Sequence, residues 1–168
     1  MEYWDIYDKD KQLPGHRMKR DDWCLKDDEY HLTVLGVVAH TDGRFLITKR
    51  KMDKPWAPGW WEVSGGACLA GEKSEEAVLR EVKDETGLDV TGWEGGYQFT
   101  YHRENPGKGD NYFVDIYRFV GDFREEDIHL QEEETDGFMM ATTDQIRAFA
   151  QEWIFLHYYS IKKVFRWE

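Results

Sequence analysis

Three acidic residues near the middle of the chain, Glu81, Asp84 and Glu85, are separated by the i, i+3 and i+4 intervals of an α-helix. This spacing would gather their carboxylates on one helix face, where like charges repel. A divalent cation that prefers hard oxygen ligands turns such repulsion into coordination, whereas the alternative is an acidic helix face that is simply solvated. Because Mg²⁺ commonly binds a few carboxylates together with water and substrate oxygens, we predict an Mg²⁺ site here, with Mn²⁺ as the alternative ion.

The residues around the acids predict the helix that would carry them, over positions 74–86. Ser74 is a candidate N-cap, the two glutamates that follow it suit the positive end of the helix dipole, and Gly87 supplies a stop. Arg80 stands four residues before Asp84, so the two side chains are expected to pair. The pairing would hold part of the acidic cluster in place.

Glycines, acids, an arginine and aliphatic residues recur at fixed intervals through this part of the chain. The positions concerned are Gly66, Glu72, Arg80, Glu81, Val82, Asp84, Glu85, Gly87 and Leu88. This pattern resembles the signature of the Nudix hydrolase family. It departs from the signature at Asp84, where the family has Glu, a side chain longer by one methylene. With ordinary residue usage, a chance match is on the order of one in ten million per starting point.

The resemblance, which extends over about residues 30–150, implies both a fold and a reaction. The fold is α/β, an α/β/α sandwich around a mixed β-sheet, with the signature forming a loop, a helix and a second loop. The reaction is the Mg²⁺-dependent hydrolysis of a diphosphate linkage, in a nucleoside diphosphate linked to another group or in a similar organic pyrophosphate. Such a linkage repels hydroxide, so cations are needed to neutralise it and to position water.

The resemblance also implies catalytic roles. Glu81 and Glu85 are expected to be the first metal ligands and catalytic residues, and Asp84 a third ligand that can bind through water. Arg80 is expected to orient one of the acids. In this family the general base is an acid of the signature or of a later loop, and we place it at Glu134, in a run of glutamates for which a solvated acidic loop is the alternative.

Substrate binding is expected at the loop before the helix. Gly66 would let the backbone approach the metal or a phosphate group, with help from Gly65, and Glu72 would anchor the loop by pairing within the signature. Arg50, at the end of a predicted strand, could contact phosphate groups or be solvated, and we include it among the substrate-binding residues. Trp56, Trp60 and Trp61 could stack on a base or pack in the core. Adjacent strand residues point to opposite faces, so at most one of Trp60 and Trp61 can face a pocket.

Two other functions stay open. The predicted hairpins and tryptophans also look like the branch of the superfamily that includes isopentenyl-diphosphate isomerase, which uses a Cys just before the signature loop and a nearby metal-binding His. Residues 62–67 read EVSGGA and contain neither, which argues against an isomerase. The other alternative, a catalytically silent binding module, is disfavoured because the acids are present. Cys68 is interpreted as a packing residue, since no His lies near it in sequence.

Predicted strands flank the signature helix on both sides. A hairpin joins residues 31–40 to 45–49 through an Asp-Gly turn, and a short strand leads into the glycines. These and later strands are expected over residues 60–64, 90–101 (with a kink or bulge near the paired glycines), 111–120 and 138–141. Two further helices would close the chain, one capped by Thr143 and one carrying an apolar stripe over residues 154–165.

The N-terminal part is expected to be an extension. Residues 1–29 would form a hairpin and a connection packed on the main Nudix-like domain, residues 30–168. The hairpin begins with a strand over residues 3–7 and a polar turn over residues 8–11. As an edge strand, residues 3–7 could also serve a homodimer.

Composition bounds the remaining properties. A chain of 168 residues that is 40% hydrophobic and 33% charged is long enough to bury a real core. Its net charge of −12 should repel nucleic-acid polymers, so the expected partner is a small-molecule diphosphate. The two cysteines offer no disulfide framework and indicate a reducing compartment. Since no signal peptide or membrane-length apolar run is found, we expect a cytoplasmic protein with no membrane partner.

Overall fold

The computed structural model describes residues 2–13, 15–19, 25–105 and 107–166. At its centre is a seven-stranded sheet built around the long strand β3 (His31–His40). β3 runs parallel to β8 (Tyr112–Gly121) and antiparallel to β4 (Phe45–Arg50) and β6 (Ser64–Ala67), so the sheet is mixed. The nearly continuous apolar run of β3 suits this central place, because its side chains are buried on both faces of the sheet.

Three further strands complete the sheet. β7 (Glu94–Arg103) pairs antiparallel with β8, while β5 (Trp61–Glu62) and β9 (Thr135–Ala141) pair antiparallel with β4. The chain between β8 and β9 contains the short 3₁₀ helix η2 (Glu125–Asp127). A single loop connects the end of β6 to the first helix, α1.

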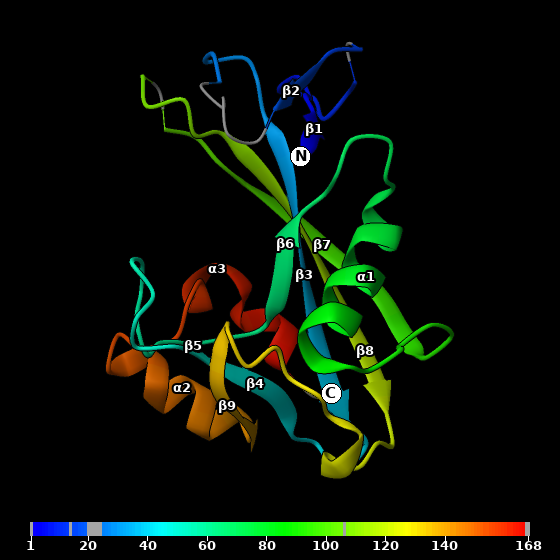
Figure 1. Cartoon of the computed structure of the whole chain (residues 1–168), viewed down its shortest axis with the longest axis vertical. Coiled ribbons are helices and arrows are strands. Elements are labelled where there is room, and N and C mark those ends of the chain that lie inside the picture. Colours follow the sequence, from blue (N-terminus) through cyan, green and yellow to red (C-terminus); the bar gives the residue numbers. More distant parts are fainter. Residues whose placement is uncertain (1, 14, 20–24, 106, 167–168) are drawn as a thin grey trace.

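Helices cover both faces of the sheet (Figure 1). α1 (Ser74–Thr86) packs on one face, where Val78 and Val82 belong to the same apolar cluster as β3 side chains. The opposite face is covered by α2 (Thr143–Gln151), α3 (Tyr158–Ile161) and the 3₁₀ helix η3 (Lys162–Phe165). This arrangement confirms the predicted α/β/α sandwich around a mixed sheet. Among the described residues, none of the helices is long and apolar enough to cross a membrane.

The N-terminal residues form a two-stranded antiparallel sheet at one end of β3 (Figure 1). β1 (Tyr3–Asp5) pairs with β2 (Arg17–Lys19), so the predicted hairpin exists, with a partner strand well beyond the predicted turn at residues 8–11. Trp4, Ile6 and Leu25 form a small apolar cluster of their own under this sheet. The predicted connection over residues 20–24 lies outside the described residues.

Several predicted boundaries shift for local reasons. The expected strand at residues 60–64 is divided into β5 and β6, because the chain changes its pairing partner from β4 to β3. The expected strand at residues 90–101 begins only at Glu94, after a turn in which Gly92 has a φ of 78°. The expected irregularity near the paired glycines is a register shift between Tyr97 and Phe99. The cap of α2 is Thr142 rather than Thr143, since its side chain accepts a hydrogen bond from the Gln145 backbone.

The predicted helix over residues 154–165 is wrong in its first part. The Ile154 carbonyl accepts from the Trp61 N–H, and the Leu156 N–H donates to the Trp61 carbonyl, so this segment is extended along β5. His157 then takes a left-handed backbone conformation, with a φ of 63°, before the short α3. Backbone pairing with β5 therefore outweighs the helical spacing of the apolar residues.

Candidate active site

Two glycines of β6, just before the loop that leads to α1, have no free space for a side chain. A Cβ on Gly65 would lie 2.3 Å from Leu35 Cδ2 and 2.5 Å from the Val34 carbonyl oxygen. A Cβ on Gly66 would lie 2.6 Å from Oε1 of Glu81. The second approach matters most, because it brings the backbone of β6 against a carboxylate of α1. A larger residue at position 66 would displace the Glu81 carboxylate, so glycine lets the strand and the acid share this space.

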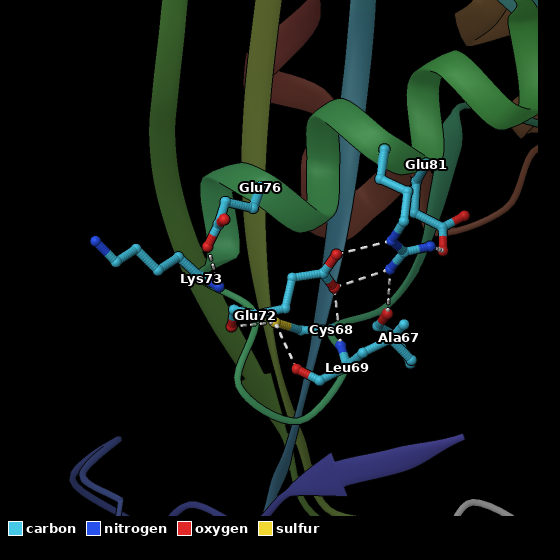
Figure 2. A network of polar contacts seen from close by, with 8 residues as sticks. Ala67, Cys68, Leu69, Glu72, Lys73, Glu76 and Glu81 are labelled. Carbon is cyan, nitrogen blue, oxygen red and sulfur yellow. Dashed lines mark hydrogen bonds and ion pairs between the residues drawn. The ribbon is translucent and has the colours of Figure 1, made fainter. Parts of the chain in front are cut away.

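Hydrogen bonds from Arg80 join α1 to Glu72 in this loop and to Ala67 at the end of β6, two residues that Figure 2 labels. Its guanidinium donates to Glu72 through Nε (2.8 Å) and Nη2 (2.9 Å), and the Leu69 N–H donates to the same carboxylate. A further nitrogen, Nη1, donates to Oε1 of Glu81 at 2.7 Å, and Nη2 also reaches the Ala67 carbonyl at 3.2 Å. Glu72 therefore anchors the loop, as predicted, through bidentate pairing with Arg80.

The predicted pairing of Arg80 with Asp84 is wrong. Arg80 turns back toward the loop, because Glu72 offers a half-buried carboxylate with two acceptor oxygens, while Asp84 is exposed to solvent. Burial raises the pKa of Glu72, but the hydrogen bonds from Arg80 and Leu69 outweigh it and hold that pKa below its usual value. The pair stays charged, and it orients Glu81 through the remaining guanidinium nitrogen.

The start of α1 also differs from the prediction. Lys73, not Ser74, is the N-cap, and its backbone N–H donates to the Glu76 carboxylate. The Ser74 hydroxyl instead donates to Asp115 Oδ2 on β8 at 2.6 Å. Asp115 is 2% exposed and offers Ser74 a buried charged acceptor, a stronger partner than the helix's own backbone. The far end of α1 is as expected, since Gly87 adopts the left-handed conformation of a helix C-cap.

Glu81 and Glu85 are the two acids that the fold brings together. Burial raises the pKa of both, and the raised pKa of Glu85 also reflects repulsion from the Glu81 and Glu62 carboxylates. The Gly65 N–H donates to Oε2 of Glu85 at 3.3 Å and partly opposes this shift. Two crowded, half-buried carboxylates beside the glycine backbone are costly without a cation.

The donor set therefore fits a divalent metal ion, with hard carboxylate oxygens from Glu81 and Glu85 next to the loop backbone. Asp84 lies on the exposed side of α1 and acts on Glu81 only by repulsion, so its place as a third ligand stays a prediction. Within the described part of the chain, no group of three or more His, Cys, Asp or Glu side chains is already arranged to hold a metal.

A third acid that sequence reasoning missed is Glu62 on β5. Its carboxylate repels that of Glu85, and burial raises its pKa although Arg50 partly opposes this. Arg50 Nη1 lies 3.4 Å from Glu62 Oε2, and its guanidinium also stacks over the Trp56 ring at 5.2 Å. The signal available in the sequence was a single acid inside a short apolar strand that leads directly into the glycines.

Glu134, the predicted general base, lies near enough to Glu62 for their charges to interact. Its carboxylate is paired with Lys54, is 48% exposed, and contributes repulsion to Glu62. Its backbone carbonyl accepts from the Lys51 N–H. Among the described residues, Glu134 forms its ion pair with Lys54 and none with Glu81 or Glu85, so its role as general base stays a prediction.

A cavity of about 390 Å³ opens beside Gly66. Half of its lining residues are aromatic, and these come from the N-terminal strand, the sheet, the loop between β4 and β5 and the C-terminal segment: Trp4, His31, Trp56, Tyr101, Tyr112 and His157. Asp110 adds a carboxylate. Trp56 was a sequence candidate, but Trp4, Tyr101 and Tyr112 were missed, because nothing in the local pattern indicates that distant segments meet here.

Of the two adjacent tryptophans, only one faces a cavity, as expected. Trp60 lines a neighbouring cavity, while Trp61 stacks on Phe149 in the core, with ring centroids 5.3 Å apart. Cys68 is buried, and its thiol donates to the Glu72 carbonyl at 3.1 Å. Burial and the nearby Glu72 raise its pKa to about 12. Such a thiol suits a packing role and not the proton shuttle of an isomerase.

Known proteins resemble this chain along most of its length. A family model described as NUDIX domain matches residues 29–163. An uncharacterised Nudix hydrolase of Listeria monocytogenes is 31% identical and aligns over 98% of this chain and 94% of its own length. The Escherichia coli nucleoside triphosphatase NudI is 35% identical over 36% of this chain and 47% of its own. The crystal structure of DR0079 from Deinococcus radiodurans shares the fold, with a TM-score of 0.70 at 19% identity, over 89% of this chain and 90% of that one.

Proposed function

This protein belongs to the Nudix hydrolases and is an enzyme of the pyrophosphohydrolase type, and we propose that it cleaves, with Mg²⁺, the diphosphate linkage between a nucleoside and another group. A similar organic pyrophosphate is the wider substrate class. The proposal depends on one observation above all: the Glu81 carboxylate lies against Gly66, the Glu85 carboxylate accepts from the Gly65 N–H, and Gly66 also lines an aromatic cavity. Acids and cavity share one edge, so a diphosphate and its organic group could bind together.

Members of the family generally use divalent metal ions, and we propose Mg²⁺, or Mn²⁺, held by Glu81 and Glu85 with Asp84 as a third ligand. When bound, such an ion would neutralise the diphosphate oxygens and lower the pKa of an attacking water. Arg80 keeps the Glu81 carboxylate in place through its 2.7 Å hydrogen bond. We propose that the backbone of Gly65 and Gly66 lets a phosphate group approach these acids.

The remaining roles follow from position. We propose Glu134 as the general base, since its carboxylate acts on Glu62, which acts on Glu85, so all three face one region. Arg50 is proposed to bind a phosphate group at the edge of the cavity, because its guanidinium lies over Trp56, one of the lining residues.

The nucleoside part of the proposal is supported by the cavity. Flat aromatic rings bind nucleobases by stacking, and this cavity is lined by tryptophan, tyrosine and histidine side chains. The E. coli relative named above as a nucleoside triphosphatase agrees with a nucleotide substrate. The acidic net charge of −12 supports a small molecule rather than a nucleic-acid polymer as the partner. A cytoplasmic location and a homodimer stay proposals on the sequence arguments given above.

The test is a direct assay in which chromatography separates the products formed from nucleotide sugars, dinucleoside polyphosphates, nucleoside triphosphates and isopentenyl diphosphate. We expect turnover of a nucleoside diphosphate derivative that stops when EDTA removes the metal and returns with Mg²⁺. Equal rates with and without EDTA, or no turnover of any nucleotide with Mg²⁺ or Mn²⁺, would contradict the proposal. Isomer formation from isopentenyl diphosphate would favour the isomerase alternative.

A further inference from the structure

The N-terminal strand β1 is joined to the signature loop by direct hydrogen bonds. The Ala70 N–H donates to the Tyr3 carbonyl at 2.8 Å, and the Gly71 N–H donates to Asp5 Oδ2 at 2.7 Å. Arg17 on β2 donates to the other oxygen of Asp5 at 3.0 Å and so fixes that carboxylate. β1 therefore runs beside the loop that carries Glu72, although the two are far apart in sequence.

Trp4 lies between these two contacts, on the opposite side of the strand. Because side chains alternate along a strand, Trp4 points inward, and it is only 5% exposed. It packs near Ala67, whose carbonyl accepts a hydrogen bond from Arg80. The ring also stacks on His31 of β3, with centroids 4.2 Å apart and planes at 11°.

The stacked rings of Trp4 and His31 form part of the wall of the cavity beside Gly66. His31 is itself 5.5 Å from the ring of Tyr112, centroid to centroid, and all three rings line the cavity. Asp110 lies in the same lining and can accept hydrogen bonds from hydroxyl or amino groups. A row of flat rings with one carboxylate suits a nucleobase and its ribose better than a branched aliphatic chain.

We propose that Trp4 is a specificity-determining residue, which the N-terminal extension supplies to form the wall against which the base of the substrate binds. This inference rests on the proposed function and deepens it, because it assigns base recognition to a residue outside the signature. The extension thus has two roles at the site: β1 positions the signature loop through its backbone and Asp5, and Trp4 completes the cavity.

The test compares three variants on two substrates. Trp4→Leu keeps an apolar side chain but removes the ring, Trp4→Phe keeps a ring, and Leu13→Ala is the control, since Leu13 lies in the same extension and is 56% exposed. The substrates are ADP-ribose, which has a base, and 5-phosphoribosyl 1-diphosphate, which has none. We expect Trp4→Leu to raise KM for ADP-ribose by about tenfold, the scale of one lost base stack, with kcat within about twofold.

The pattern across substrates separates recognition from folding. We expect Trp4→Leu to leave KM for the base-free substrate unchanged, Trp4→Phe to recover most of the loss, and Leu13→Ala to behave as wild type. Equal effects on both substrates, or no effect of Trp4→Leu on ADP-ribose, would overturn the inference while leaving the proposed hydrolase intact.

A binding measurement keeps the inference testable without turnover or the leucine variant. In a ¹⁵N-labelled wild-type spectrum, the Trp4 indole N–H signal is the one that Trp4→Phe lacks. We expect it to shift when AMP is added and to stay unchanged when ribose 5-phosphate is added. If wild type hydrolyses no diphosphate but this shift occurs, the proposed function fails and the inference stands. If AMP leaves the signal unchanged, the inference is wrong.

Discussion

Arg80 and Glu72 form a bidentate pair, with hydrogen bonds of 2.8 and 2.9 Å, that joins the middle of α1 to the loop before it. The same guanidinium orients Glu81, so the position of a proposed metal ligand depends on a residue nine positions earlier in the chain (Figure 2). Planar pairing of this kind needs the fork of an arginine. The geometry of the acids is therefore set by the loop as well as by the helix.

Arg80→Lys tests whether Arg80 both anchors the loop through Glu72 and orients Glu81. A lysine cannot donate to Glu72 through two parallel bonds and reach Glu81 as well, so we expect activity to fall about tenfold to hundredfold and the free energy of unfolding by about 1–3 kcal/mol. Steady-state kinetics and urea unfolding measure the two. The matched control is Arg147→Lys, whose partner Asp144 is exposed, and we expect it to cost below about 0.5 kcal/mol. Similar losses in both variants would contradict the orienting role of Arg80.

Glu85→Gln tests the proposed metal ligands. We expect the rate to drop by at least about two orders of magnitude, roughly 2.7 kcal/mol of barrier. In metal-free buffer the variant should be at least as stable as wild type, because it removes a half-buried charge that faces Glu81. Thermal unfolding with and without Mg²⁺ checks this, and Mg²⁺ should stabilise wild type but not the variant. Equal stabilisation by Mg²⁺ would place the ion elsewhere.

Glu134→Gln tests the proposed general base. Loss of a positioned base should lower kcat by about a hundredfold or more, with a small change in KM. Glu132→Gln is the control, because it removes the same charge from the same acidic run. If the two variants keep equal and nearly wild-type rates, Glu134 is a solvated loop residue and the base lies within the signature.

Asp115→Ala should be strongly destabilising. The carboxylate is buried and accepts from Lys11 Nζ (2.7 Å), Ser74 Oγ (2.6 Å) and Thr100 Oγ1 (2.6 Å), so its loss leaves several donors unsatisfied. We expect the free energy of unfolding in urea to fall by about 3 kcal/mol. Lys11→Met should cost less, about 1 kcal/mol, because the other two donors remain and Lys11 is partly exposed. Equal losses would mean that the ion pair alone stabilises this network.

Cys68 should resist alkylation in the folded protein. Its pKa is raised to about 12, first by burial, so the reactive thiolate at pH 8.5 is scarcer by about three orders of magnitude than in the unfolded chain, where a thiol has its ordinary pKa near 8.5. Iodoacetamide labelling of a Cys24→Ser background, with and without urea, measures the difference. Fast labelling of the folded protein would show that the thiol is neither buried nor protonated.

Local spacing was enough to predict much of this protein. The helix over residues 74–86, the strand over residues 31–40 and the pairing of Glu81 with Glu85 on one helix face follow from intervals of two to four residues. The resemblance to Nudix hydrolases rests on the same kind of pattern, and the family is confirmed. These features could be read from the chain because backbone geometry fixes the direction of side chains that are close in sequence.

The partners of those side chains depended on the tertiary structure. Arg80 turns to Glu72 instead of Asp84, Ser74 to Asp115, and Trp4 reaches a cavity whose other walls come from β3, β7, β8 and the C-terminal segment. For Arg80 and Ser74, a buried or half-buried carboxylate outside the helix offers a stronger contact than the partner predicted from spacing. Which distant groups meet is decided by how the sheet and loops pack, and no interval in the sequence encodes that.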